Sequence, residues 1–496
     1  MTALAALVAG LIAFIVVLKG LNVERHAGGA IRTAQNAVAA IADPDITDDA
    51  KERHARRATL SLLKSALVLL VIGAAACLAA AAIVAGGDLL GFYDLDEAVA
   101  MAMSPWFILG SCAGAVALWL VHARSGEQAS TPGTATGDAR YSALDKALHN
   151  YAFASPARQV MLSSIEDRLW RQTIAATRSE RPVFITSLPR AGTTMMLELL
   201  AAQKEFASAT YRNMPFTMAP LLWGRFSGVF RKTGEKAERA HGDGIEVGFD
   251  SPEAFEEMIW MAFWRERYEG GRIGLWSEAD SKPEFEAFLA RHMRKIVAGA
   301  PGACRYVSKN NANIARLPLL AKAFAEAQVL IPLRDPLAQV ASLMRQHRRF
   351  TALHAGDRFA RQYMEGIGHF EFGAALRPIA FPGAPEDTAG AEQADYWLRY
   401  WIAAYEHVLR TAPATALFVD HDALSRRPAL HLPLLAEALG VADRAAFLSA
   451  SAMFRPSGSR PDLPGASPDL ARRAGELHDA LIERTLQPLP LERRAV

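Results

Sequence analysis

The chain of 496 residues has few cysteines and no acceptor tripeptide for N-linked glycans. Of its three cysteines, Cys77 and Cys112 stand inside long apolar runs, which leaves Cys304 alone in the remainder of the chain. A disulfide within that remainder is therefore excluded. The absence of Asn-x-Ser/Thr fits a domain that never enters a glycosylating compartment. The formal net charge of +2 indicates no particular partner.

Charged side chains are absent from three runs in the first quarter of the chain, residues 1–18, 65–87 and 98–121. Each run is about long enough to cross a ~30 Å hydrocarbon core at roughly 1.5 Å per residue. The sequence therefore predicts an all-α membrane region, residues 1–124, with three transmembrane helices. The first run lacks the basic leader and the cleavage site of a signal peptide, which favours an uncleaved anchor. A buried helix of a soluble domain is the alternative for the second run.

Basic residues lie between the first and second runs, where eight lysines and arginines occur, whereas the only charged residues in 88–97 are acidic. Because loops rich in Lys and Arg stay in the cytoplasm, we expect a multi-pass protein of the inner (cytoplasmic) membrane. The large C-terminal part should then be cytoplasmic. A Ser/Thr/Gly/Pro-rich stretch, residues 125–138, predicts a flexible linker to a second domain, residues 139–496.

Residues 181–201, RPVFITSLPRAGTTMMLELLA, predict a strand, a tight loop and a helix that starts at Thr193. The free N–H groups and the dipole of a helix N-terminus can hold a phosphate or sulfate. Gly192 would let the backbone approach such an anion, and the hydroxyls of Thr193 and Thr194 would donate to it. The lysine that precedes Ser/Thr in the ATP and GTP loop is missing, which argues against a standard kinase or ATPase. A plain turn is the alternative.

Three further apolar runs predict strands, residues 305–308, 327–333 and 414–419, and helical stretches alternate with them. Such alternation is typical of a parallel sheet flanked by helices, in which ligands bind at the carboxyl ends of the strands. Those ends carry the loop described above, Lys309, Arg334 and Asp420.

The run VLIPLRDPLAQVASLMRQH supplies a second candidate anion site. Asp335 and Pro336 predict the start of a helix directly after Arg334. Ser342 lies two turns into that helix, so a guanidinium and a hydroxyl could meet on one phosphate. An Arg-Asp pair that merely starts a helix is the alternative.

Together, PRAGTT and the element formed by Arg334 and Ser342 resemble the sulfotransferases, cytosolic-type and bacterial, that use 3′-phosphoadenosine 5′-phosphosulfate (PAPS). The resemblance implies a P-loop-like sulfotransferase fold in the second domain, PAPS as co-substrate and no metal. It implies that Arg190 stands where the family has lysine and meets the charge on the leaving group. The backbone amides from Ala191 to Thr194 would hold the 5′-phosphate, and Arg334 with Ser342 would hold the 3′-phosphate.

The chain departs from the family pattern where a base is needed to take the proton of the acceptor hydroxyl. Lys309 is followed by two asparagines instead of Thr-His, so Lys309 could assist the leaving group but the histidine is absent. Between the two anion motifs, the candidate bases are His241, Asp250, Glu253 and Glu257, of which we favour Glu253. The segment DSPEAFEE, residues 250–257, also predicts a helix capped by its serine, so Glu253 could merely complement the helix dipole.

We expect the acceptor to be a hydroxyl on a membrane lipid, glycolipid or lipid-linked glycan, because tethering raises the effective concentration of acceptors in the same membrane. Apolar side chains between the motifs, Trp260 and Trp264 among them, could form its surface. No nucleic-acid partner is expected, and the oligomeric state is open. The alternative function is a membrane-tethered P-loop nucleotide-binding protein, kinase-like or NTPase-like, with Asp420 at a metal-binding strand end.

Overall fold

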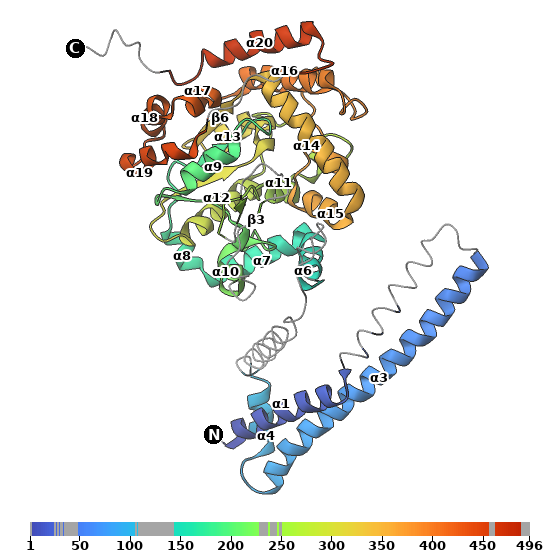
Figure 1. Cartoon of the computed structure of the whole chain (residues 1–496). Coiled ribbons are helices and arrows are strands. Elements are labelled where there is room, and N and C mark those ends of the chain that lie inside the picture. Colours follow the sequence, from blue (N-terminus) through green and yellow to red (C-terminus); the bar gives the residue numbers. More distant parts are fainter. Residues whose placement is uncertain are drawn as a thin grey trace. The chain divides into compact units, whose positions relative to one another are not determined.

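A computed structural model describes residues 2–23, 48–104, 143–227, 250–455 and 462–487, together with isolated positions and two short strands between these ranges. The chain divides into two compact units, residues 1–133 and 134–496 (Figure 1). The predicted linker, residues 125–138, and His241 lie outside the described residues.

The first unit is helical. Helix α1 (Thr2–Gly20) packs against the long helix α3 (Asp48–Leu89), and the short helix α4 (Leu95–Ala102) follows. The packing is close at Gly10, where a Cβ would lie 3.3 Å from the carbonyl oxygen of Ala80. Asp94 caps α4, because its side chain accepts a hydrogen bond from the backbone N–H of Asp96.

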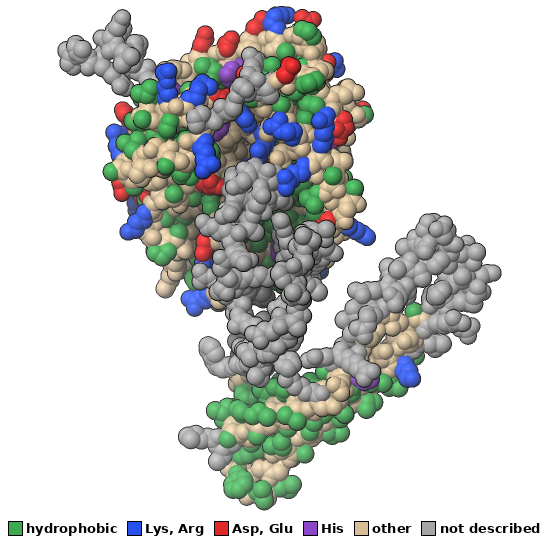
Figure 2. Space-filling view, in the orientation of Figure 1, with side chains coloured by type: hydrophobic (Ala, Val, Ile, Leu, Met, Phe, Trp, Pro, Cys, Tyr) green, Lys and Arg blue, Asp and Glu red, His purple; other side chains and the backbone are tan. Residues whose placement is uncertain are grey.

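Only one helix in the described part of the chain, Ser61–Leu89, is both long and apolar enough to cross a membrane; Ala3–Leu18 is apolar but shorter. Leu67, Leu70 and Leu78 on that helix are 63%, 68% and 71% exposed, which does not fit the core of a soluble domain. In Figure 2, apolar side chains cover much of the visible surface of this unit.

The prediction of three transmembrane helices is not confirmed. The first two runs, 1–18 and 65–87, are helical from Thr2 onward, but only the second meets the length of a span. Of the third run, 98–121, the described part ends its helix α4 at Ala102, and most of the remainder lies outside the described residues.

The second unit contains a five-stranded parallel sheet in the order β2-β5-β1-β6-β7. The strands are β1 (Val183–Ile185), β2 (Phe206–Ala207), β5 (Arg305–Lys309), β6 (Gln328–Leu333) and β7 (Leu417–Asp420). A separate antiparallel pair consists of β3 (Ala237–Glu238) and β4 (Glu246–Val247). The parallel sheet flanked by helices confirms the fold class predicted for the second domain. The four short apolar runs predicted as strands correspond to β1, β5, β6 and β7.

Both faces of the sheet are buried. Successive side chains of each strand point to opposite faces, and each face packs against its own set of helices. Val183, Ile185 and Leu330 belong to one apolar cluster, which α9 and α18 complete. Phe184 and Val329 point to the opposite face and belong to a second apolar cluster. That cluster includes side chains of α12, α13, α14 and α16. The central strands are therefore fixed from both sides, and their carboxyl ends are held in place.

The helices of the second unit connect and cover these strands (Figure 1). In chain order they are α6 (Ala143–Phe153), α7 (Pro156–Leu169), α8 (Arg171–Ala176), α9 (Thr193–Ala201), α10 (Pro220–Ser227), α11 (Glu257–Phe263), α12 (Pro283–Ala298), α13 (Leu317–Ala323), α14 (Pro336–Gly356), α15 (Arg358–Ile367), α16 (Ala394–Thr411), α17 (His421–Arg426), α18 (Pro428–Leu439), α19 (Arg444–Ser449) and α20 (Pro468–Ile482).

The start of α14 agrees with the sequence, since the side chain of Asp335 accepts a hydrogen bond from the N–H of Ala338 and Pro336 is the first helical residue. The start of α11 was predicted wrongly, because this helix begins at Glu257 and not at Pro252, directly after the predicted cap Ser251. Pro252 instead forms an antiparallel bridge with Thr210, and the N–H of Glu253 donates to the carbonyl of residue 209. Pairing with a distant segment has overridden the local capping pattern.

Candidate functional site

The loop between β1 and α9 is shaped to hold an anion. Gly192 adopts a left-handed conformation with φ of 92° directly before the helix. A Cβ at this position would lie 2.4 Å from Nδ1 of His421, so only glycine fits. Within the described part of the chain, the backbone N–H groups of Ala191 and Gly192 donate to no residue. These amides at a helix N-terminus are suited to phosphate oxygens.

One glutamine of α14 anchors the first half of this loop. Nε2 of Gln339 donates to the carbonyl oxygens of Leu188 and Pro189, at 3.1 Å and 2.9 Å. Its Oε1 accepts hydrogen bonds from Nε1 of Trp401 and from the hydroxyl of Tyr405. The side chain is buried, and all its polar sites are used. The loop is therefore ordered before any ligand binds.

The two motifs that the sequence placed far apart touch each other in the structure. Nε of Arg190 donates to Oγ of Ser342 at 3.0 Å, and NH1 of Arg334 donates to the backbone carbonyl of Arg190 at 3.0 Å. Ser342 is buried on α14, and Arg334 follows β6. Arg190 has a φ of 71°, a conformation that directs its side chain at the cost of local strain.

The guanidinium of Arg334 has capacity for a further acceptor. Its Nε is buried and has no hydrogen-bond partner among the described residues. Burial lowers the pKa of Arg334, and this effect is opposed by the carboxylate of Asp422 and reinforced by Arg190 and Arg345. A phosphate would provide both the missing acceptor and the missing negative charge. The residues present therefore fit a nucleotide that carries phosphate groups.

The imidazole of His421 closes the site behind Gly192. The side chain is buried, and its Nδ1 has no hydrogen-bond partner among the described residues. Burial lowers the pKa of His421; Asp422 opposes this shift and Arg334 reinforces it. The imidazole is therefore neutral at pH 7, and it packs against the loop rather than adding charge.

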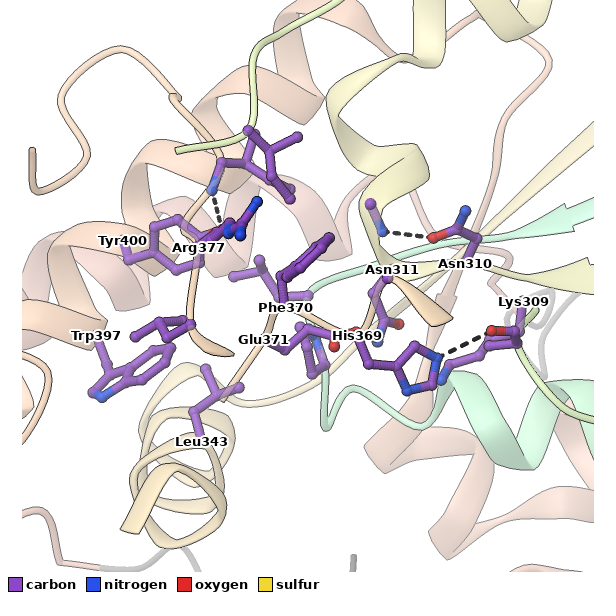
Figure 3. Close-up of a pocket in the computed structure, with 18 residues that line it drawn as sticks. Lys309, Asn310, Asn311, Leu343, His369, Phe370, Glu371, Arg377, Trp397 and Tyr400 are labelled. Carbon is purple, nitrogen blue, oxygen red and sulfur yellow. Dashed lines mark hydrogen bonds between the residues drawn. The ribbon is translucent and has the colours of Figure 1, made fainter. Parts of the chain in front are cut away.

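A narrow pocket begins at Leu188 and Pro189 and continues past the end of β5 (Figure 3). Its free volume is about 40 Å³. Lys309 and Asn311, both buried, line it at the end of β5. The apolar walls come from segments distant in the sequence, namely Leu343, Phe370, Leu376, Ile379 and Trp397.

Polar groups cluster where this pocket meets the anion loop, the loop between β1 and α9. Oδ1 of Asn311 accepts a hydrogen bond from the hydroxyl of Thr193 at 3.3 Å, and its Nδ2 donates to Oε1 of Glu371 at 3.0 Å. Asn311 thus joins the anion loop to the pocket wall. His369 and Arg377 line the same pocket. Sequence reasoning missed His369 and Glu371, because no local motif marks them.

Glu253 lies apart from the residues that line the pocket, although its neighbour Ala254 is one of them. Its Oε2 accepts a hydrogen bond from the hydroxyl of Tyr211 at 2.7 Å, and its Oε1 accepts one from the N–H of Ala254 at 2.8 Å. The side chain is buried. Both carboxylate oxygens therefore already serve in hydrogen bonds within this loop.

The other glutamates of DSPEAFEE form a buried polar network. Glu257 accepts hydrogen bonds from Arg316, Asn310 and Tyr268. Burial lowers the pKa of Arg316, but Glu257, Tyr268 and Glu256 together outweigh burial and raise that pKa. Asn310 Nδ2 donates to Glu257 at 2.7 Å, which fixes the chain directly after Lys309. Glu257 is accordingly a structural partner of the strand end.

Trp260 and Trp264, predicted as possible acceptor surface, are 0% and 3% exposed and belong to the core. Trp260 lies 4.0 Å from the guanidinium carbon of Arg316, in cation–π contact. The apolar wall beside the anion loop comes instead from α14, α16 and the segment that follows α15.

The site therefore combines an anion loop at the carboxyl end of a parallel sheet, two arginines beside that loop and an apolar pocket in contact with it. Residues 182–444 match the sulfotransferase family, which is just over half of the chain. The chain therefore belongs to the sulfotransferase family.

Two solved structures resemble the chain at low identity. Sulfotransferase STF9 from Mycobacterium avium shares 15% identity with a TM-score of 0.38, over 64% of this chain and 81% of that one. Sulfotransferase STF1 from Mycobacterium tuberculosis H37Rv shares 14% identity with a TM-score of 0.38, over 69% and 88%. Similarity at this level is too low to support any detail of the site. No curated protein matches the chain.

Proposed function

We propose that this protein transfers a sulfuryl group from PAPS to a hydroxyl acceptor. The observation that carries the proposal is the contact between Arg190 and Ser342, which joins a loop suited to a 5′-phosphosulfate with an element suited to a 3′-phosphate. When bound, PAPS supplies an activated sulfuryl group. The chain's own residues position it, stabilise charge and accept a proton.

The roles follow from the positions of the residues. The amides of Ala191 to Thr194 hold the 5′-phosphate, while Arg334 and Ser342 hold the 3′-phosphate. Arg190 stabilises the charge that develops on the bridging oxygen as the sulfur–oxygen bond breaks. Lys309, which lines the pocket, assists in stabilising the same charge. The proposal requires no metal.

Calorimetry with adenosine 3′,5′-bisphosphate and adenosine 5′-monophosphate tests the donor assignment. We expect the bisphosphate to bind more tightly, and Arg334→Ala to remove most of the difference, because a charge-assisted hydrogen bond contributes about 1.5–3 kcal/mol. Arg348→Ala is the matched control, since Arg348 is an exposed arginine of α14, the helix that follows Arg334, and is paired with Glu392. Equal affinity for the two nucleotides in the unaltered protein would refute the assignment of Arg334 and Ser342. Stabilisation by Mg-ATP instead would favour the kinase-like alternative.

For the acceptor we propose a hydroxyl on a membrane lipid, glycolipid or lipid-linked glycan. The apolar walls of the pocket support an acceptor with an apolar body, and helix α3 supports a membrane location. Lipid mass spectrometry of cells that express the unaltered protein or Arg190→Ala tests this proposal. The unaltered protein should yield lipid species heavier by one sulfuryl group. If the only products that differ are soluble compounds without a lipid-linked precursor, the acceptor is not a membrane component.

We further propose a multi-pass protein of the cytoplasmic membrane with the catalytic domain, residues 139–496, in the cytoplasm behind the linker 125–138. A reporter fused after Val496 should be active only if it functions in the cytoplasm, and one inserted near Asp94 only if it functions outside. The opposite pattern would separate the site from a cytosolic donor and would contradict this topology.

A further inference from the structure

Transfer to a hydroxyl releases a proton, and the pocket beside the anion loop must contain a group that accepts it. Five side chains with titratable or charged groups line this pocket, Lys309, His369, Glu371, Arg377 and Tyr400. Lysine and arginine in their charged forms have no lone pair to offer. Burial raises the pKa of Tyr400, so its hydroxyl stays protonated. His369 and Glu371 remain.

Glu371 already serves another purpose. Its Oε1 accepts a hydrogen bond from Nδ2 of Asn311, whose Oδ1 in turn accepts one from Thr193 of the anion loop. Protonation of Glu371 would weaken the contact that aligns Asn311. This carboxylate therefore positions the loop that carries the donor.

His369 is oriented as a base. One of its ring nitrogens, Nε2, lies 3.0 Å from the backbone carbonyl oxygen of Ala254. A carbonyl only accepts hydrogen bonds, so in the neutral ring the hydrogen is on Nε2 and the lone pair is on Nδ1. Figure 3 shows the imidazole beside Lys309, in the pocket that Leu188 and Pro189 also line.

The backbone that presents His369 is fixed by the buried network of α11. Gly368 ends α15 with φ of 79°, and a Cβ there would lie 2.5 Å from Cγ of Glu257. Glu257 is in turn held by Arg316. The acidic segment DSPEAFEE thus contributes to the site by holding His369, through Glu257 and through the carbonyl of Ala254.

From this geometry we propose that His369 is the general base, an assignment that rests on the proposed sulfuryl transfer. The acceptor oxygen forms a bond to sulfur while the bond from sulfur to the bridging oxygen of the 5′-phosphate breaks. Nδ1 of His369 takes the acceptor's proton, and adenosine 3′,5′-bisphosphate leaves with the electron pair of the broken bond. Of the charged side chains nearby, Lys309, Glu371 and Arg377 line the same pocket as His369, and Glu257 packs against the preceding Gly368.

The test uses the full chain in membranes, radiolabelled PAPS and a total lipid extract of the same cells. His369→Gln keeps a donor for the carbonyl of Ala254 but removes the base. It should lower the rate of transfer by roughly 10²–10⁴-fold, the usual contribution of general base catalysis. Its affinity for adenosine 3′,5′-bisphosphate, measured by calorimetry, should not change. His431→Gln, at a histidine of α18 that does not line the pocket, is the matched control and should retain the rate, whereas Glu253→Gln tests the base that the sequence favoured.

Rescue by added imidazole distinguishes loss of the base from a folding defect. Added imidazole should restore transfer in His369→Gly and should have no effect on Glu371→Gln, which we expect to weaken donor binding instead. Retention of most of the rate by His369→Gln, a loss in Glu253→Gln as large as in His369→Gln, or loss of bisphosphate binding in His369→Gln would overturn the assignment. If the unaltered protein labels no acceptor at all, the proposed function itself fails, and the base assignment fails with it.

Discussion

The donor side and the acceptor side of this site are built in different ways. The donor side consists of two short segments, the loop before α9 and the start of α14, whose residues contact one another through Arg190, Ser342 and Arg334. The acceptor pocket draws its walls from at least five separate segments between Leu188 and Tyr400. Residues in a short segment can be identified from local sequence patterns. Residues brought together by tertiary packing cannot be identified in this way. Substitutions on the two sides should therefore have different effects on binding and catalysis.

Among changes on the donor side, the largest effect should come at Arg190. Arg190→Ala removes the charge that we propose stabilises the leaving group, and loss of such a group costs about 2.7–4 kcal/mol, or roughly 10²–10³-fold in kcat. Single-turnover transfer from radiolabelled PAPS would measure it. Arg190→Lys should retain most of the rate, because the charge remains. An equal loss in both variants would mean that Arg190 acts through its shape and not its charge.

Gly192→Ala should have the next largest effect. The substitution places a side chain in a left-handed conformation and within 2.4 Å of His421, so we expect a cost of roughly 1–3 kcal/mol and weaker bisphosphate binding. Gly270→Ala is the control, since Gly270 has a similar φ of 103° with nothing within 4 Å of a Cβ. Thermal unfolding and calorimetry on both variants would separate backbone strain from the clash. If both variants lost the same stability and bound bisphosphate equally well, the His421 side chain would be able to move away from the new methyl group.

A smaller effect at Asn311 would test whether the two sides are coupled. Asn311→Ala removes hydrogen bonds to Thr193 and Glu371, each contributing about 0.5–1.5 kcal/mol. We expect both weaker bisphosphate binding and a higher KM for the acceptor. Asn150→Ala, an exposed position on α6, should change neither quantity. A change confined to one substrate would show that the donor and acceptor sides act independently.

The smallest effect concerns pH. Because burial lowers the pKa of His421, the folded state favours its neutral form. The resulting stability is present above its ordinary pKa of about 6.5 and is lost as the pH falls below it. His421→Gln should therefore flatten the loss of stability in acid, as measured by urea unfolding at several pH values. His431→Gln, at a less buried histidine of α18, should flatten it less. An unchanged acid dependence in His421→Gln would contradict the role of burial.

Much of the fold could be predicted from the sequence. The apolar runs that became β1, β5, β6 and β7 are bounded by turn residues and buried on both faces. Strand β2 has only two residues, too few to show any periodicity. The helix expected to begin at Pro252 failed because this residue pairs with Thr210, a contact that no local pattern reveals.

Some residues of the site could likewise be predicted from the sequence, and others could not. Lys309 and Arg334 could be placed because the carboxyl ends of parallel strands meet at one edge. His369 could not, since it follows the end of α15 and reaches the pocket only through the packing of Gly368 on Glu257. Gln339 was equally hidden, although it belongs to the same run as Arg334 and Ser342, because its partners are backbone carbonyls of a different segment.

The four hydrogen bonds of Gln339 have a kinetic consequence. A loop that is ordered during folding has no conformational search left to make when the donor arrives, and no side-chain freedom of Gln339 is lost at that step. Association of the nucleotide should then proceed without a slow rearrangement, and differences in affinity among nucleotides should arise mainly from how fast each one dissociates. Stopped-flow measurements should accordingly give single-exponential binding whose observed rate rises linearly with nucleotide concentration.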